Sequence, residues 1–455
     1  MNNKGSAMKT RNVGKYRLLA IGAAMATMLT GCAGAAPGKS APAGVTGEGD
    51  VAGTIQLTWW GSGPRNEKTN AVADQFVKLH PGVTIKRSSA DFSNYWTKLN
   101  VQAAGKSLPC VTQTQARQLN DYTKRNVFLP LDPMIKSGVI DVSQIPKSLL
   151  DTGRGPDGKL YMLPYGAAYD AIAVNTTLAD AAGVGVLKSG YTWDDYSKWL
   201  MAAKDKLPEG VSATDLRGGE PDIFIGYVAG NNGGESLFND KGELNFSKEL
   251  LTTYWNMWED LREAGATNSQ SSQAEEPTAS EASYIATGKV MSDTRPGNRL
   301  VGMQDALDGA APGQKLTTML YASGSDGPGN VLITSGFSIP VSCNNVPTAA
   351  AFIDYFTNDP DAGKTFASDN GAATNSKVLA AQVDDTSISP LLRHSLELFQ
   401  EMAADPKTQA IVYPAGYQAA FETTFTRIYQ DIAFGKTSVE QGVNDFFKEA
   451  NAGLS

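Results

Sequence analysis

Few of the residues that build common catalytic centres occur in this sequence. It contains two histidines, His80 and His394, and three cysteines among 455 residues. A histidine-based metal site or a serine–histidine–aspartate triad would have to be built around one of these two histidines. The G-x-S-x-G elbow, the P-loop and the H-E-x-x-H motif are absent from the sequence. We therefore expect neither a resident metal nor a cofactor, and these absences argue against most classes of enzyme.

Basic stretches and long apolar runs are also missing after residue 29. The formal net charge is −8, which argues against a nucleic-acid partner because phosphate backbones are bound by clustered lysine and arginine. The one marked apolar run covers residues 18–29, which is well short of the ~20 residues that span a membrane. Any contact of the mature chain with a membrane is thus expected to depend on an anchor.

The N-terminus has the pattern of a bacterial secretion signal. Basic residues without acidic ones precede the apolar run, and small residues follow it. The sequence at its end, Leu29-Thr30-Gly31-Cys32, resembles the bacterial lipobox, which implies cleavage before Cys32 and lipidation of its thiol. We therefore predict a signal peptide at 1–31 and a lipid-anchored protein on the outer face of the cytoplasmic membrane. The alternative is a buried N-terminal helix with an incidental cysteine.

The composition changes after the signal. Residues 32–53 consist almost wholly of Ala, Gly, Pro, Ser and Thr with a few charges. Such a composition cannot bury a core and predicts a flexible tether. About 400 residues remain from Thr54 onward, enough for two domains.

The first part of the globular region alternates between strand and helix patterns. Strand-like runs at 54–60, 83–85 and 110–114 alternate with helix-like runs at 67–79 and 95–104. This βαβαβ order predicts an α/β fold with a parallel sheet and right-handed crossovers. Ligands of open α/β sheets bind beyond the carboxyl ends of the strands, where this chain carries indole, carboxylate and carboxamide groups.

The apolar faces of other predicted helices are expected to pack in the core. Apolar residues recur at helical spacing over 421–432 and again over 439–447. Trp255 and Trp258 belong to a third such pattern. Thr192, followed by an acidic residue three positions later, predicts a capped helix N-terminus.

A glycosidase is the hardest enzyme to exclude because it needs only two carboxylates. The adjacent acidic pair at 194–195 is explained by helix capping. The pair at 275–276 falls in a polar segment, 267–283, which we expect to be a surface loop with solvated charges. A distant pair such as Asp91 with Asp170 stays open. A secreted carbohydrate-active enzyme is therefore the alternative from a different class.

Seven short motifs occur in an order that resembles a known protein family. From about Thr54 to the C-terminus, this order resembles the extracellular solute-binding proteins, family 1, of carbohydrate ABC importers, which are similar in fold to maltose-binding protein. Each motif is weak alone, and their order and spacing carry the resemblance. They are WWG at 59–61, F-x-x-x-x-P-G-V at 76–83, LPLD at 129–132, GKLYMLPYG at 158–166, TWDDY at 192–196, ATGKVMSD at 286–293 and AAAFIDYFTNDPDAGKTFA at 349–367.

The resemblance implies a two-lobed α/β receptor without catalytic activity. One lobe would comprise 54–165 plus 334–385 and the other 166–333 plus 386–455, with a ligand cleft between them. Closure of the hinge would bury an oligosaccharide, expected to be a di- to tetrasaccharide, and the closed monomer would deliver it to the membrane subunits of an ABC importer. The same fold with a polyol, a polyamine or glycerol phosphate as its ligand is the second alternative.

A sugar site needs aromatic platforms for the C–H faces of the rings and planar polar groups for the hydroxyls. Alternation along the first strand favours Trp60 in the cleft and Trp59 in the core, whereas Tyr95 and Arg295 could equally have structural roles. The predicted ligand-binding residues come from strand ends and from segments where the family contacts its ligand. They are Trp59, Trp60, Arg65, Asp91, Tyr95, Gln113, Gln115, Tyr169, Asp170, Asn232, Gly233, Thr294, Arg295, Asn298 and Gly336.

Two cysteines remain once Cys32 is assigned to lipid. Counting alone leaves a Cys110–Cys343 disulfide and two separate buried thiols equally open. The family resemblance favours the disulfide, because its fold places the strand that holds Cys110 beside the strand that leads to Cys343. The family usually has an aspartate at the position of Cys110, so this pairing would be a departure from the family pattern.

Overall fold

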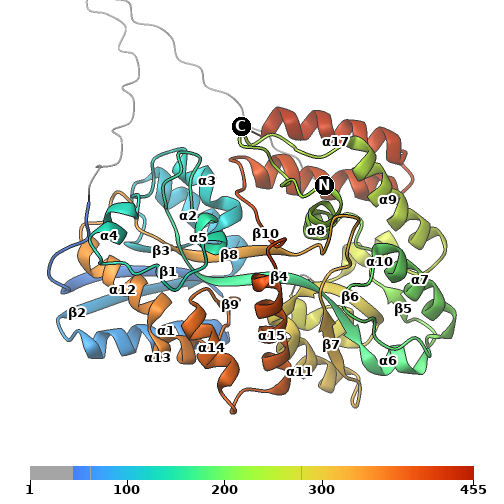
Figure 1. The fold of residues 1–455 in the computed structure, drawn as a ribbon, viewed down its shortest axis with the longest axis horizontal. Helices are drawn as coiled ribbons and strands as arrows, with labels where there is room; N and C mark the ends of the chain where they lie inside the picture. The colour runs from blue at the N-terminus through green and yellow to red at the C-terminus, as the bar shows by residue number, and fades with distance from the viewer. Residues whose placement is uncertain (1–44, 62, 278, 455) are drawn as a thin grey trace, which may run out of the picture. The chain divides into compact units, whose positions relative to one another are not determined.

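The computed structural model describes residues 45–61, 63–277 and 279–454 (Figure 1). The predicted signal peptide, Cys32 and residues 33–44 lie outside the described residues. Within the described part of the chain, no helix is both long enough and apolar enough to cross a membrane.

The parallel strands predicted near the N-terminus form one half of the fold. β1 (Gly53–Trp60) lies between β2 (Val83–Ala90) and β3 (Val111–Gln115) and pairs in parallel with both. α1 (Gly63–Leu79) connects β1 to β2, and α2 (Phe92–Ala104) connects β2 to β3. The βαβαβ prediction is confirmed. We call this sheet, with the helices that pack on it, the first lobe.

A single long strand passes from this sheet into a second one. In β4 (Leu163–Asn175), residues 163–169 pair with β8 (Val331–Ser338) of the first sheet, and residues 170–174 pair with β6 (Val290–Pro296). The strand order is therefore β2-β1-β3-β8-β4-β6-β5, and β4 runs through the middle of Figure 1. We call the elements around β6 the second lobe. This two-lobed α/β architecture is the predicted fold class.

The other strands are short and extend these two sheets. β5 pairs with β6, β7 and β9 pair with β4, and β10 pairs with β8. Their bounds are β5 (Ser212–Thr214), β7 (Leu316–Met319), β9 (Ala372–Ala373) and β10 (Gln409–Ala410).

Helices cover both sheets. In the first lobe, α1 packs with α12 and α13 on one face of the sheet (Figure 1). The remaining α-helices are α3 (Ala116–Thr123), α4 (Asp132–Lys136), α5 (Lys147–Asp151), α6 (Thr176–Ala181), α7 (Trp193–Ala203), α8 (Pro221–Asn231), α9 (Lys248–Glu263), α10 (Gln270–Glu275), α11 (Leu300–Ala310), α12 (Val346–Asn358), α13 (Pro360–Phe366), α14 (Ser376–Asp384), α15 (Pro390–Ala404), α16 (Thr424–Ala433) and α17 (Val439–Gly453). Shorter turns are η1 (Lys204–Lys206), η2 (Ser280–Ala282), η3 (Ile285–Thr287), η4 (Gly297–Arg299) and the π-helical η5 (Gln418–Thr423).

The capping and core predictions for these helices are confirmed. Thr192 Oγ1 accepts a hydrogen bond from Asp195 N at 3.1 Å, and Asp195 Oδ2 accepts one from Thr192 N at 3.0 Å, so that two otherwise unpaired amides at the start of α7 are satisfied. Trp255 and Trp258 of α9 are fully buried, as is Phe425 of α16, where the predicted apolar stripe faces the second-lobe core.

The tether prediction was wrong for its last residues. Val45 and Val51 pack against the apolar core of the first lobe. Ser137 Oγ donates to Thr46 O at 2.8 Å, and Ala52 N donates to Thr348 Oγ1 at 3.1 Å. Residues 45–52 are thus held by the first lobe. Composition did not indicate this, because two valines among small residues are enough to bind a segment to a core that already exists.

Candidate functional site

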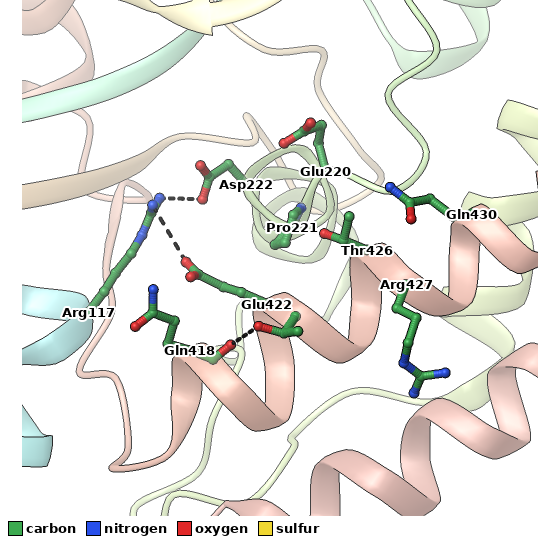
Figure 2. A pocket seen from close by; sticks show the side chains of 10 residues that line it. Arg117, Glu220, Pro221, Asp222, Gln418, Glu422, Thr426, Arg427 and Gln430 are labelled. Atoms are coloured by element: carbon green, nitrogen blue, oxygen red, sulfur yellow. Dashed lines mark hydrogen bonds and ion pairs between the residues drawn. The ribbon is translucent and has the colours of Figure 1, made fainter. Parts of the chain in front are cut away.

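A pocket of about 500 Å³ opens where helix α3 of the first lobe faces α8, η5 and α16 of the second (Figure 2). Arg117, two residues beyond the end of β3, reaches into it from the first lobe, and its other lining residues belong to the second lobe. They are Glu220, Pro221, Asp222, Gln418, Glu422, Thr423, Thr426, Arg427 and Gln430. The pocket therefore lies at the junction of the lobes, near the carboxyl end of a central strand.

A second pocket of about 290 Å³ shares Glu220 and Asp222 with the first. The first turn of α8 forms a wall common to the two, and we call both pockets together the cleft. The other residues that line the second pocket are Asp170, Arg217, Ile223, Gln273, Glu276, Pro277, Thr294, Arg295 and Pro296.

Arg117 forms ion pairs across the cleft. Its guanidinium contacts Asp222 Oδ1, and its Nη1 lies 3.6 Å from Glu422 Oε1. Burial lowers the pKa of Arg117, but the charges of Asp222 and Glu422 outweigh burial and raise it well above its ordinary value. Burial also raises the pKa of Glu422 to about 7, against the opposing effect of Arg117. The cleft thus holds carboxyl groups in an environment that resists their negative charge.

Among the acidic residues that line the cleft, Asp170 has the largest upward shift of its pKa. It lies on β4 opposite Pro296 of β6. Burial raises its pKa, the charge of the neighbouring Asp222 raises it too, and Arg117 lowers it, with a resulting value of about 8. Among the residues that the structure describes, none forms a hydrogen bond or ion pair with its side chain. Asp170 therefore lines the second pocket without a partner in the described part of the chain.

A buried ion-pair cluster lies behind the second pocket. Asp293 Oδ1 is 2.7 Å from Arg217 Nε, and its Oδ2 is 2.7 Å from Arg295 Nε. Glu276 contacts both guanidinium groups, and Asp215 Oδ2 lies 2.8 Å from Arg217 Nη2. Burial raises the pKa of Asp215 to about 8, as expected when three carboxylates share two cations.

The position of Glu276 corrects the prediction of a solvated loop at 267–283. Its side chain is 4 % exposed and ion-paired, and the segment contains α10 and η2. Oxygens of Asp215, Glu276 and Asp293 lie within 4.8 Å of one another. The two guanidinium groups already lie among these oxygens, so the cluster is an ion-pair network that holds β6 and the turn before α8 together.

Three of the predicted ligand-binding residues line the cleft: Asp170, Thr294 and Arg295. Arg295 lies in the ion-pair cluster, which is the structural role that was weighed against ligand contact. The principal cleft residues that sequence reasoning missed are Arg117, Asp222 and Glu422. A proline at the first helical position followed by an acidic residue predicts the helix start that holds Asp222, but no local signal marks the other two.

The two tryptophans at the end of β1 face opposite sides of the strand, as alternation predicted, but Trp60 is buried and lines neither pocket of the cleft. Trp59 packs in the first-lobe core, and its Nε1 donates to Asn66 Oδ1 at 2.8 Å. Trp60 is 5 % exposed and lies among Phe92, Tyr95 and Trp96, with ring centroids 5.4 to 5.6 Å away. Only Phe92 of this aromatic group is well exposed, at 44 %. In this conformation Trp60 and Tyr95 offer a sugar little surface, and Phe92 offers the most.

Gln113 and Arg65 form internal contacts in the first lobe. Gln113 is buried, its Oε1 accepts from Trp60 N at 2.8 Å, and its amide donates to the Tyr165 hydroxyl. Arg65 is also buried, with its Nε 2.7 Å from Asp369 Oδ1. Tyr95 OH donates to Gln113 O at 2.6 Å. These three side chains support the strand ends and leave little surface for a ligand.

Other predicted residues form hydrogen bonds between their side chains and backbone groups. Asp91 caps α2 by accepting from Asn94 N at 3.1 Å, and Tyr169 OH donates to Ser395 O at 2.8 Å. Asn232 Nδ2 donates to Asn245 O at 2.7 Å. None of these side chains lines the described pockets.

The last four predicted residues differ in their accessibility. Gly233 has φ +65° in an open turn, whereas a Cβ on Gly336 would lie 2.3 Å from Leu163 O. Asn298 Nδ2 donates to Asp369 O at 3.3 Å, a contact between the two lobes. Gln115, at the end of β3, is partly exposed, and its Oε1 has no partner among the described residues.

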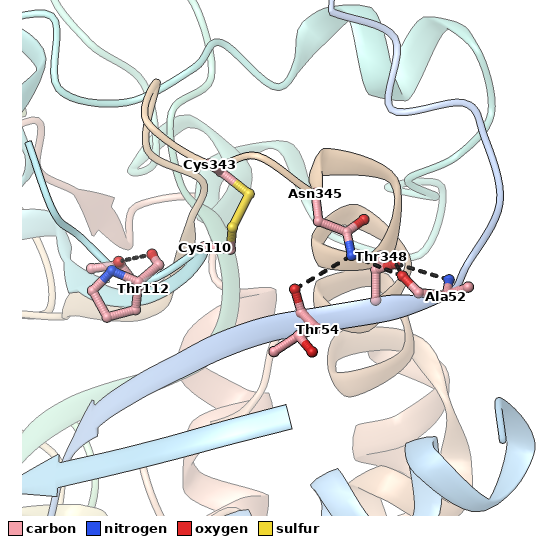
Figure 3. Close-up of a disulfide and its surroundings, with 8 residues drawn as sticks. Ala52, Thr54, Cys110, Thr112, Cys343, Asn345 and Thr348 are labelled. Carbon is pink, nitrogen blue, oxygen red and sulfur yellow. Dashed lines mark hydrogen bonds between the residues drawn. A yellow bond between two sulfur atoms is a disulfide. The ribbon is translucent and has the colours of Figure 1, made fainter. Parts of the chain in front are cut away.

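The Cys110–Cys343 disulfide favoured by the family resemblance is present (Figure 3). It joins the residue before β3 to the segment between β8 and α12, across 233 residues of sequence. In the same region Asn345 Nδ2 donates to Ala52 O at 2.8 Å. The disulfide therefore fastens the far end of the first sheet, on the side opposite to the strand ends that lead to the cleft.

A sequence model of one protein family, described as bacterial extracellular solute-binding protein, matches residues 71–390, more than two thirds of the chain. Solved structures with the same fold include a periplasmic solute-binding protein from Pectobacterium atrosepticum (22 % identity, TM-score 0.75, 88 % of this chain and 98 % of that chain). The GacH receptor of Streptomyces glaucescens, studied unliganded and with acarbose, is also similar (20 %, TM-score 0.72, 89 % and 99 %). A third is a periplasmic oligogalacturonide-binding protein from Yersinia enterocolitica, in complex with saturated digalacturonic acid (17 %, TM-score 0.72, 88 % and 98 %).

Proposed function

We propose that this chain, which belongs to the bacterial extracellular solute-binding proteins, binds an oligosaccharide between its lobes and delivers it to an ABC importer. The observation that carries the proposal is the position of the cleft. Its walls come from both lobes, and Arg117 of the first lobe reaches Asp222 of the second. A ligand held there contacts both lobes and can favour their closure, because it binds the closed form with more contacts than the open form.

The chemistry of the cleft suits a polyhydroxylated ligand. Gln418, Gln430 and Thr426 line it with amide and hydroxyl groups, beside the charged residues. A sugar hydroxyl both donates and accepts, so such side chains can bind it in pairs at about 1 kcal/mol net for each neutral hydrogen bond. Phe92 supplies an exposed aromatic ring in the first lobe. The sugar ligands of the GacH receptor and of the oligogalacturonide-binding protein support this ligand class.

The anchor proposal concerns Cys32. A receptor fixed to the membrane through this residue stays at a high effective concentration near its importer, and the membrane subunits would recognise the closed monomer. Mass spectrometry of the membrane-extracted protein tests this proposal. We expect a diacylglyceryl adduct at Cys32 and release of a Cys32→Ser variant into the medium. An unmodified Cys32 in protein that is still membrane-bound would contradict it.

Calorimetry with mono- to tetrasaccharides tests the receptor assignment. We expect one-to-one binding, and chromatography of the same mixtures should recover every sugar unchanged. Release of smaller sugars would identify a carbohydrate-active enzyme instead. Binding of a polyol, a polyamine or glycerol phosphate, with no sugar bound, would keep the receptor but contradict the oligosaccharide.

A further inference from the structure

We propose that the solute carries a protonated amine, so that the ligand is an amino-sugar oligosaccharide rather than a neutral one. This inference rests on the proposed receptor function and specifies its ligand. It follows from the balance of charge in the cleft, from a carboxyl group without a partner, and from an unpaired hydroxyl beside it.

Carboxyl groups outnumber cations in and behind the cleft. Apart from Arg427, the described residues that line it or bind to its walls provide seven carboxyl groups and three guanidinium groups. The cations are Arg117, Arg217 and Arg295. The carboxyl groups are Asp170, Asp215, Glu220, Asp222, Glu276, Asp293 and Glu422. Arg427 also lines the first pocket, but it pairs with Glu449 on the surface.

The three cations are already committed to carboxylates. Arg217 and Arg295 lie in the buried cluster, where Arg217 Nη1 is also 3.2 Å from Glu220 Oε1. Arg117 forms ion pairs with both Asp222 and Glu422. This leaves Asp170 without a partner among the described residues, at the edge of the second pocket. A cation from the ligand would supply the missing charge.

Tyr321 provides a second unpaired group at the same place. Its side chain is 94 % buried, since it is 6 % exposed, and its hydroxyl has no hydrogen-bond partner among the described residues. The ring packs on α8, where a Cβ on Gly226 would lie 2.4 Å from Tyr321 Cδ2. β7 pairs with the antiparallel strand β4, and continuation of their register by two residues beyond Met319 brings Tyr321 level with Asp170. Burial raises the pKa of Tyr321 well above its ordinary value, as do the charges of Asp170 and Asp222.

An ammonium group fits this arrangement better than a hydroxyl does. It has three donors and a full positive charge, so it can donate to more than one of the carboxyl oxygens that line the second pocket. A neutral hydroxyl has one donor and leaves the excess negative charge in place. A uronic acid would add a further carboxylate to the seven and is disfavoured by like-charge repulsion.

The raised pKa values give the proposal an independent signature. Burial holds the pKa of Asp170 at about 8 and that of Glu422 at about 7, so near neutral pH both groups are partly protonated in the free protein. A bound ammonium group would lower both pKa values, and protons would leave as it binds. Calorimetry in buffers of different ionisation enthalpy should therefore detect proton release for an amino sugar and less for a neutral sugar.

Matched sugars test the inference directly. For each linkage and length, calorimetry compares oligomers of glucosamine, glucose and glucuronic acid near neutral pH. We expect the glucosamine member to bind at least tenfold more tightly than the glucose member, which is about 1.4 kcal/mol, and the glucuronic acid member to bind most weakly. Equal or tighter binding of the glucose member would overturn the inference and leave the receptor function standing. Absence of binding by every sugar would overturn the proposed function itself.

Two variants locate the effect. Asp170→Asn and Asp222→Asn should each reduce the ratio of the affinity for the glucosamine member to that for the glucose member at least tenfold. Asp194→Asn is the matched control, since it removes the same charge from an exposed acid of α7 whose partner is Lys198. An unchanged preference in both cleft variants, with folding verified by thermal unfolding, would overturn the assignment to these carboxyls. Asp170→Asn should be tolerated because burial already favours a neutral side chain at this position.

Discussion

Arg117 of α3 and Asp222 of α8 form an ion pair that joins the two lobes across the cleft. Neighbouring contacts reinforce this junction: Asn120 Nδ2 donates to Tyr413 O at 2.8 Å, and Gly416 N donates to Asp121 Oδ1 at 2.8 Å. Helix α3 is therefore the part of the first lobe that meets the second lobe beside the cleft.

Removal of Arg117 should destabilise the protein. In Arg117→Ala, Asp222 loses an ion pair and Glu422 keeps its burial without a compensating cation, so we expect a loss of about 1.5–3 kcal/mol in the free energy of unfolding. Arg427→Ala is the matched control, because its pair with Glu449 is about half exposed on both sides and should contribute less than ~1 kcal/mol. Urea unfolding of both variants measures the difference. Equal losses would show that the pair across the lobes adds nothing.

The raised pKa of Asp170 should produce a pH-dependent contribution to stability. Its folded-state value of about 8 exceeds the unfolded value of about 3.9, so the folded state binds more protons between these limits and stability falls as pH rises. Asp170→Asn removes this contribution. We therefore expect the free energy of unfolding of Asp170→Asn to increase relative to that of the wild type as pH rises from about 5 to about 8. A constant difference across this range would contradict the assignment.

Asp293 should show the opposite behaviour. Burial raises its pKa, but Arg217 and Arg295 outweigh burial and hold the pKa below the ordinary value. Its stabilising contribution is thus present above the unfolded pKa of about 3.9 and is lost as pH falls. We expect the deficit of Asp293→Asn to be large near neutral pH and to shrink in acid, in the same unfolding experiments. A deficit that grows in acid would be inconsistent with the ion pairs.

Loss of the disulfide should lower the free energy of unfolding, because the unfolded chain gains entropy when the cross-link is removed. For the long loop between Cys110 and Cys343, the chain-entropy estimate is up to ~5 kcal/mol. The double variant Cys110→Ser, Cys343→Ser should therefore unfold at lower urea. A reductant should lower the unfolding midpoint of the wild type and leave the variant unchanged. A wild type that does not respond to full reduction would contradict a stabilising role.

Two variants in the aromatic group at the end of β1 should affect stability and binding differently. Trp60→Ala empties a buried site and should cost about 3–5 kcal/mol in unfolding free energy. Phe92→Ala removes a ring that is 44 % exposed, so it should cost less stability and, through the loss of stacking on the sugar, weaken binding about tenfold. Thermal unfolding and calorimetry on the same samples measure both effects. Wild-type affinity in Phe92→Ala would place the sugar elsewhere.

Periodicity and composition were sufficient for the scaffold. Alternating side chains along β1 separate Trp59 from Trp60 because consecutive residues of a strand face opposite sides, and the structure places them in different cores. Motif order indicated the two-lobed fold and the partner for Cys110. The boundary of the tether was missed, because the packing of Val45 and Val51 depends on a core built from residues far away in the sequence.

The cleft, in contrast, depends on tertiary structure. Segments in which the family contacts its ligand indicated Asp170 and Thr294, which line the cleft. Gln113 and Arg65, chosen at or just beyond a strand end of the first lobe, are buried by partners that only folding brings to them. Arg117 and Glu422 are 305 positions apart, and nothing local to either residue predicts that they meet. Sequence by itself determined the fold class and the family, because both follow from local periodicity and motif order. The identity and charge of the cleft were decided by the packing of α3 against α8 and η5, since burial and Coulomb interaction act through space.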